Sequence, residues 1–191
     1  AAREEYNRRV PAALDTPKNI GLYRFQAADY FFIYGQFEEA QKRFTPIYEQ
    51  ECGKTSWGYK AWERLTTMAN RDGKIAESRK LAEAALAHPC STSEEEKLKE
   101  AAIARPTIAL GYYVDAGEAF KKAQGMPDGP ERNKAWREAA ALYKVALEKA
   151  PSRDEAPEAA MNGAYCYKQV GDYDQAIAMY SLFIKEYGNE D

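Results

Sequence analysis

The feature that most constrains this chain is a short segment that recurs along it. It reads GDYDQAIAMY at residues 171–180, GQFEEAQKRF at 35–44 and, more weakly, GKIAESRKLA at 73–82. In each copy an apolar residue stands two positions after the glycine and a small residue five positions after it. Gly35 and Gly73 lie roughly 40 residues apart, and self-similarity at such a period is typical of stacked repeat units.

The composition indicates an all-α protein. Ala, Glu, Lys, Gln and Leu fill most segments, and runs of β-branched residues are absent. The net charge is −3 with acidic and basic residues interspersed, which argues against a nucleic-acid partner. No apolar run approaches 18 residues, so we expect no membrane insertion. The chain starts AAREEY, without Met, and a repeat is under way by residue 20. We therefore expect it to be a piece of a longer protein.

Few residues are suited to catalysis or metal binding. The chain has one histidine, His88, and three cysteines. A zinc site needs about four suitable ligands, and a Ser-His-Asp triad would have to use His88, which directly precedes Pro89. The paired carboxylates at 38–39 and 94–96 fit solvated helix faces and first turns rather than a buried acid–base pair. We expect no enzyme activity, no cofactor and no metal.

Apolar spacing and turn residues predict antiparallel helix pairs in four units, 18–52, 56–90, 93–151 and 153–188. We expect Pro46 to bend its helix and Pro106 to kink or break a long one, so the third unit is irregular. The expected helix-capping residues are Thr55 or Ser56 in the second unit and Asp154 or Ser152 in the last. The expected helices run over 18–34, 36–51, 57–71, 74–88, a long stretch to about 124, 130–149 and a final pair.

The repeated positions resemble the tetratricopeptide repeat family, in which small residues stand where two helices cross and large aromatic residues stand between them. In the second unit Trp62 and Leu65 fall where that family has its Trp and Leu. The matching positions are Ala164, Tyr167, Gly171, Tyr173, Ala176 and Tyr180 in the last unit and Ala28, Phe31, Gly35, Phe37, Ala40 and Phe44 in the first.

This resemblance implies one array over 1–191, an α-solenoid of antiparallel helix pairs with about eight or nine helices. The last unit, which ends in EYGN, is also similar to repeats of bacterial envelope proteins, including gliding-motility scaffolds of myxobacteria.

The resemblance also implies a concave surface formed by the first helix of each pair, which receives a partner. The family's Lys-Asn-Asn-Lys-Arg carboxylate-binding set is not present in order, so that activity is not expected here. The apolar residues of the first unit have a second interpretation: they pack against a preceding repeat. Aromatic residues elsewhere fit core positions better than a ligand cage. The implied partner-binding residues are Phe25, Asp29, Phe32, Lys60, Glu63, Arg71, Met161, Asn162, Tyr165 and Lys168.

Cys52 and Cys90 both follow the second helix of a repeat, at the same position of the family pattern. They are either a disulfide or two unrelated surface thiols; a disulfide indicates an oxidising compartment. Cys166 is expected to be a small core residue.

Together these features predict a non-catalytic scaffold for a protein or peptide partner, periplasmic or in the cell envelope, with the cytoplasm as the alternative location. Other repeats of the same chain are also candidate partners. Two other functions remain open: a regulatory or substrate-docking domain of a larger enzyme, and a purely structural spacer.

Overall fold

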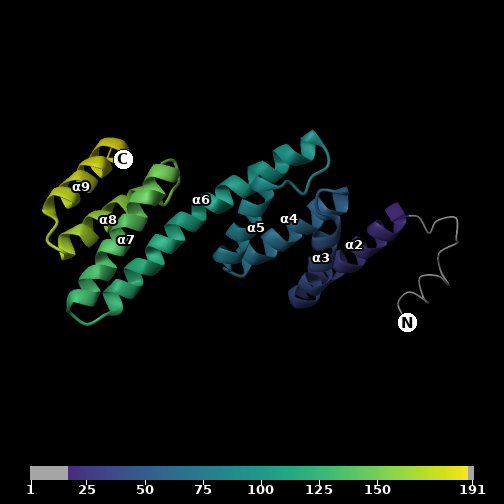
Figure 1. The fold of residues 1–191 in the computed structure, drawn as a ribbon, viewed down its shortest axis with the longest axis horizontal. Helices are drawn as coiled ribbons and strands as arrows, with labels where there is room; N and C mark the ends of the chain where they lie inside the picture. Colours follow the sequence, from purple (N-terminus) through teal and green to yellow (C-terminus); the bar gives the residue numbers. More distant parts are fainter. Residues whose placement is uncertain (1–16, 189–191) are drawn as a thin grey trace. The chain divides into compact units, whose positions relative to one another are not determined.

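The computed structural model describes residues 17–188 of the chain. Within this range there are eight helices and no strand, which confirms the predicted all-α class. The helices are α2 Pro17–Ile33, α3 Phe37–Glu51, α4 Ser56–Arg71, α5 Ile75–Ala87, α6 Glu94–Gly125, α7 Pro130–Lys149, α8 Ala156–Gln169 and α9 Tyr173–Tyr187 (Figure 1).

The three glycines that open the repeated segment occupy one kind of turn. Gly35, Gly73 and Gly171 have φ values of 74°, 68° and 74°. Each stands two positions after the last residue of the first helix of a pair, at α2, α4 and α8. A left-handed residue at this point ends a helix, and glycine adopts that conformation without steric cost. The sequence repeat therefore corresponds to a repeated backbone turn.

The helix ends agree with some of the expected capping residues. The Thr55 side chain accepts a hydrogen bond from the Trp57 backbone N–H at the start of α4. The prediction for α8 is wrong, because that helix begins at Ala156 after Glu155, which makes no side-chain cap. Pro46 lies inside α3 and Pro106 inside α6, and both helices continue through their proline, so the expected break at Pro106 does not occur.

The chain divides into two compact units after Arg105, a point inside α6. In the first unit α2 packs on α3, α3 on α4 and α4 on α5, and α2 also contacts α4. The shared core of α2, α3 and α4 is made of Phe25, Ala28, Ala40, Phe44, Ile47, Ala61, Leu65 and Met68.

In the second unit, α7 packs on α8 and α8 on α9. The part of α6 after Pro106 belongs to the same core, since the Phe120 ring lies 5.3 Å from the Trp136 ring of α7. The Tyr113 hydroxyl donates to the Ala150 carbonyl oxygen at 2.6 Å, which ties α6 to the end of α7. Small residues, including Ala139, bring the helix backbones close together.

The close helix crossing in the second unit gives a test of this packing. Ala164 of α8 is fully buried, as its small-residue position predicts. We expect Ala164→Leu to lower the free energy of unfolding by about 1–3 kcal/mol, because added methylenes in a filled core displace their neighbours. Thermal and denaturant unfolding measure the change. Ala141→Leu, on the exposed side of α7, is the matched control; equal stability of the two variants would contradict the crossing.

Candidate functional site

Two of the predicted partner-binding residues lie against Arg64, at the contact of α2 and α4. The Asp29 carboxylate accepts a hydrogen bond from the Arg64 guanidinium, with 2.7 Å between Nε and Oδ1. The same guanidinium lies over the Phe32 ring, 4.7 Å from its centroid. Asp29 and Phe32 are thus held on one surface by Arg64, which the sequence analysis did not identify. The equivalent position of the last unit, Asn162, was among the candidates, since both residues stand nine positions before a turn glycine.

Two further basic side chains of α4, each in a cation–π contact, extend this surface along the helix. The Lys60 ammonium lies 4.6 Å from the centroid of the Trp57 ring, and the Arg71 guanidinium lies 3.6 Å from that of Phe37. Lys60, Glu63, Arg64 and Arg71 share one side of α4, because residues three, four, seven and eleven positions apart line up along a helix. We call Asp29, Phe32, Lys60, Glu63, Arg64 and Arg71 the α2–α4 face.

The expectation for Phe25 needs correction. Its side chain is only 9% exposed, and its ring lies 5.3 Å from that of Phe44 and 5.5 Å from that of Trp57. Phe25 is therefore part of the core that joins α2, α3 and α4, and it is not presented to a partner. Phe32 is half-buried over the same core. The aromatic surplus of α2 is explained in part by packing within its own unit.

The other predicted residues belong to the second unit. Met161 and Tyr165 of α8 are each 40% exposed, and Lys168 is exposed. The Tyr165 ring contacts those of Phe120 and Trp136, at 5.9 Å and 5.8 Å. The Asn162 amide donates to the Glu158 carboxylate at 3.4 Å. The structure thus brings the predicted residues together in two separate groups, one in each unit.

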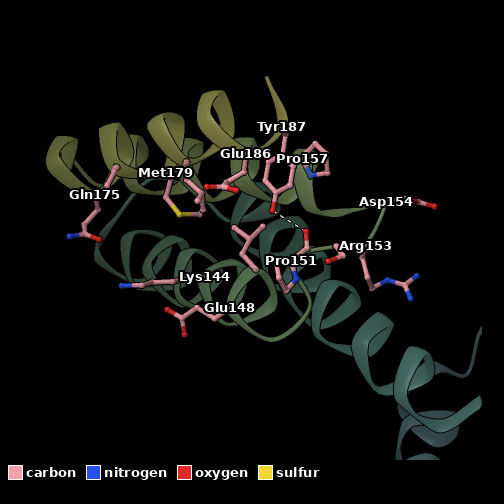
Figure 2. Close-up of a pocket in the computed structure, with 14 residues that line it drawn as sticks. Lys144, Glu148, Pro151, Arg153, Asp154, Pro157, Gln175, Met179, Glu186 and Tyr187 are labelled. Atoms are coloured by element: carbon pink, nitrogen blue, oxygen red, sulfur yellow. Dashed lines mark hydrogen bonds between the residues drawn. The ribbon is translucent and has the colours of Figure 1, made fainter. Parts of the chain in front are cut away.

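The second unit also contains an open pocket of about 1190 Å³ that the sequence did not predict (Figure 2). The Tyr187 hydroxyl closes one end by donating to the Pro151 carbonyl oxygen at 3.1 Å. Helices α7 and α9 and the loop before α8 form its walls. The lining residues are Lys144, Leu147, Glu148, Pro151, Ser152, Arg153, Asp154, Pro157, Gln175, Ala178, Met179, Leu182, Glu186 and Tyr187.

The charges around this pocket do not select one kind of ligand. Lys144 and Arg153 stand beside Glu148, Asp154 and Glu186. The Arg153 guanidinium is already engaged, since it donates to both carboxylate oxygens of Glu155 at 2.8 Å and 2.9 Å. The pairing holds the pKa of the Glu155 carboxyl below its usual value. The pocket lining therefore combines apolar residues, among them Leu147, Met179 and Leu182, with residues of both charges.

Beside α6 the first unit holds a disulfide and a buried carboxylate. Cys52 and Cys90, the pair considered from the sequence, are joined by a disulfide, and the Gly53 backbone N–H donates to the Cys90 carbonyl oxygen at 2.9 Å. Glu100 of α6 is 1% exposed. Its carboxylate accepts hydrogen bonds from the backbone N–H groups of Cys90 and Ser91, at 2.8 Å and 3.0 Å, and from the Ser91 hydroxyl.

This group of contacts joins α6 to the loop that carries Cys90. A carboxylate that accepts three hydrogen bonds from one loop holds that loop in place, and no other charged side chain is hydrogen-bonded to it among the described contacts. Sequence reasoning missed Glu100 because it lies in a run of acidic and basic residues that resembles a solvated helix face. The sequence signal that could have indicated this role is the position of Glu100 in the first helix after the loop that carries Cys90.

The remaining chemistry of the described residues is limited. Burial raises the pKa of the free Cys166 thiol to about 12, so this thiol stays protonated and is a poor nucleophile. Between residues 17 and 188 no group of three or more His, Cys, Asp or Glu side chains is arranged to hold a metal ion. No helix in that range is both long enough and apolar enough to cross a bilayer.

No protein-family model and no curated protein sequence matches this chain.

Proposed function

We propose that this protein is a non-catalytic scaffold of tetratricopeptide type that binds a protein segment on the α2–α4 face. The observation that carries the proposal is that three cations of one helix, Lys60, Arg64 and Arg71, each lie on an aromatic ring. Cation–π contacts hold long side chains in place, which lowers the entropy lost when a partner binds them. Aromatic and arginine side chains are also the residues most often important in protein interfaces.

The charge of this face favours an acidic partner segment. Asp29 offsets the charge of Arg64 through their ion pair. Lys60 and Arg71 stand on either side of that pair along α4, and Glu63 is the other acid of the face. A segment with two carboxylates, spaced to reach both cations, would gain electrostatic attraction during approach and in the complex.

The second group, Met161, Asn162, Tyr165 and Lys168, supports a second contact with the same partner or with another. The exposed side chains of Met161 and Tyr165 supply apolar area, and Lys168 supplies charge.

We propose that the protein acts in the periplasm or cell envelope of a bacterium, because the Cys52–Cys90 disulfide suits an oxidising compartment. A motility assembly is one setting in which we propose that it serves as a scaffold. The alternatives are a cytoplasmic protein, a docking domain of a larger enzyme and a structural spacer.

Charge reversal of the α2–α4 face tests the binding proposal. We expect Lys60→Glu combined with Arg71→Glu to weaken capture of the partner about 10-fold or more and to reduce its dependence on salt. Chemical crosslinking in cells of the source organism, followed by quantitative mass spectrometry against the wild-type chain, measures capture. The affinity for a recovered acidic segment is then measured by calorimetry at two salt concentrations.

The matched control is Lys80→Glu, because Lys80 is exposed on α5 and lies outside the α2–α4 face. Circular dichroism establishes that both variants keep the helical fold. A partner that binds the double variant and the wild type equally well would exclude this face as its docking site.

A further inference from the structure

Exposed large apolar side chains gather on the first and last described helices. On α2 we define the α2 stripe as Tyr23, Ala27 and Tyr30, and on α9 the α9 stripe as Tyr173, Ile177 and Ile184. Tyr30 is 56% exposed, and the members of the α9 stripe are 63%, 62% and 68% exposed. The spacing in each stripe places its members along one side of a helix, and no stripe position carries a charge.

The positions equivalent to the α2 stripe are buried elsewhere in the chain. Counted back from the turn glycine, they are Ala61, Leu65 and Met68 in α4 and Ala159, Gly163 and Cys166 in α8. All six are buried.

In α4 these three residues belong to the core that joins this helix to α3. In α8, Gly163 lies between α7 and α9: a Cβ there would lie 3.2 Å from the Cβ of Tyr143 of α7 and still closer to the Met179 side chain of α9. This side of a first helix therefore packs on the second helix of the preceding pair, α4 on α3 and α8 on α7.

The positions equivalent to the α9 stripe show the other half of the same contact. When Ala139 and Tyr143 of α7 are aligned with Ala176 and Tyr180 of α9, the stripe corresponds to three residues of α7 that are at most 5% exposed, Trp136, Ala140 and Leu147. Helix α8 follows α7 and packs on it. The α9 stripe is thus the surface on which a further first helix packs.

We propose that the α9 stripe of one copy of this chain packs on the α2 stripe of a second copy, in the way that α3 packs on α4. The contact between α3 and α4 shows which side chains meet at such an interface. There Arg71 of α4 lies over the Phe37 ring of α3. The equivalent positions are Ile33, directly beside the α2 stripe, and Tyr173, and both side chains are more than 60% exposed. An apolar pair replaces the cation–π pair, so the two surfaces suit each other.

Such a contact is heterologous, because it joins two different surfaces. When two copies have joined, one α2 stripe and one α9 stripe remain unused at the two ends of the assembly. Further copies can then add head to tail until the assembly closes into a ring or continues as a filament. The α2–α4 face is not part of the contact, so this self-association goes beyond the proposed function and can fail independently of it.

Two variants of the whole chain, each lacking one surface, test the proposal. The first, Tyr23→Glu with Tyr30→Glu, removes the α2 stripe; the second, Ile177→Glu with Ile184→Glu, removes the α9 stripe. Leu98→Glu is the matched control, since Leu98 is a strongly exposed apolar residue of α6 outside both stripes. Sedimentation velocity over a range of concentrations measures the size of the species, and circular dichroism establishes that each variant is folded.

We expect the wild type and the control to form dimers and longer species as the concentration rises. Each stripe variant alone should associate at least about 30-fold more weakly. An equimolar mixture of the two should form dimers and nothing longer, because one intact α9 stripe then meets one intact α2 stripe.

Three results would overturn the proposal. A wild-type chain that stays monomeric up to about 1 mM would show that no second copy covers these stripes. A stripe variant that still dimerises alone would show a symmetric contact, and a mixture without dimers would show that the two stripes do not meet.

Discussion

Replacement of Glu100 by alanine is expected to lower the free energy of unfolding of the first unit by about 2–4 kcal/mol. The carboxylate is buried and accepts hydrogen bonds from the backbone of Cys90 and Ser91 and from the Ser91 hydroxyl. Its removal leaves these donors without a partner and empties the space of the side chain. Both consequences are costly in the interior of a protein, where water cannot replace the lost acceptor.

The measurement that isolates this effect is amide hydrogen exchange. We expect the Cys90 and Ser91 amides to lose protection in Glu100→Ala, while amides of the second unit keep theirs. Denaturant unfolding gives the global change. Glu95→Ala on the same helix is the matched control, because Glu95 is exposed and forms only a surface ion pair with Lys99, a type of contact that contributes at most about 1 kcal/mol.

A third variant separates charge from shape. Glu100→Gln keeps one acceptor oxygen in a side chain of similar size but places an NH₂ group where the second oxygen accepts. We expect it to be more stable than Glu100→Ala and less stable than the wild type. If the alanine variant were as stable as Glu95→Ala, the carboxylate would not hold this loop in solution.

The helices could be predicted from the sequence because local chemistry fixes them. Gly35, Gly73 and Gly171 end the first helices, and the spacing of apolar residues gives the helices on both sides. Pro130 at the start of α7 marks that helix to the residue. The wrong capping residues of α8 are a local error of one or three positions, since several polar residues before Ala156 can each start a helix.

The surfaces could be predicted only in part, because exposure depends on neighbours that a single helix does not specify. Phe25 and Phe32 look alike in the sequence of α2, yet one is core and the other half-buried beneath Arg64. The role of Arg64 depends on Asp29, which lies in another helix pair. The α7–α9 pocket depends on how two helices and a loop come together, and no short motif encodes that arrangement.

Removal of the Cys52–Cys90 disulfide is expected to lower the free energy of unfolding by about 3–4 kcal/mol. The two residues are 38 positions apart, and a closed loop of that length restricts the unfolded chain strongly, whereas an open chain is free to expand. Cys52→Ala with Cys90→Ala tests the effect without a reductant. Chemical denaturation, monitored by the fluorescence of the tryptophans, gives the change in free energy.

Reduction of the wild type should lower its stability to that of the double variant. The same reductant should leave the stability of the double variant unchanged, which controls for other effects of the reductant. Glu100 holds the backbone of Cys90 and the disulfide holds its side chain. The decreases in the free energy of unfolding caused by Glu100→Ala and by removal of the disulfide should therefore not be additive. Once the disulfide is absent, the loop is held by the Glu100 carboxylate, and Glu100→Ala should then release it fully in hydrogen exchange. Additive losses would mean that the two contacts act on different parts of the first unit.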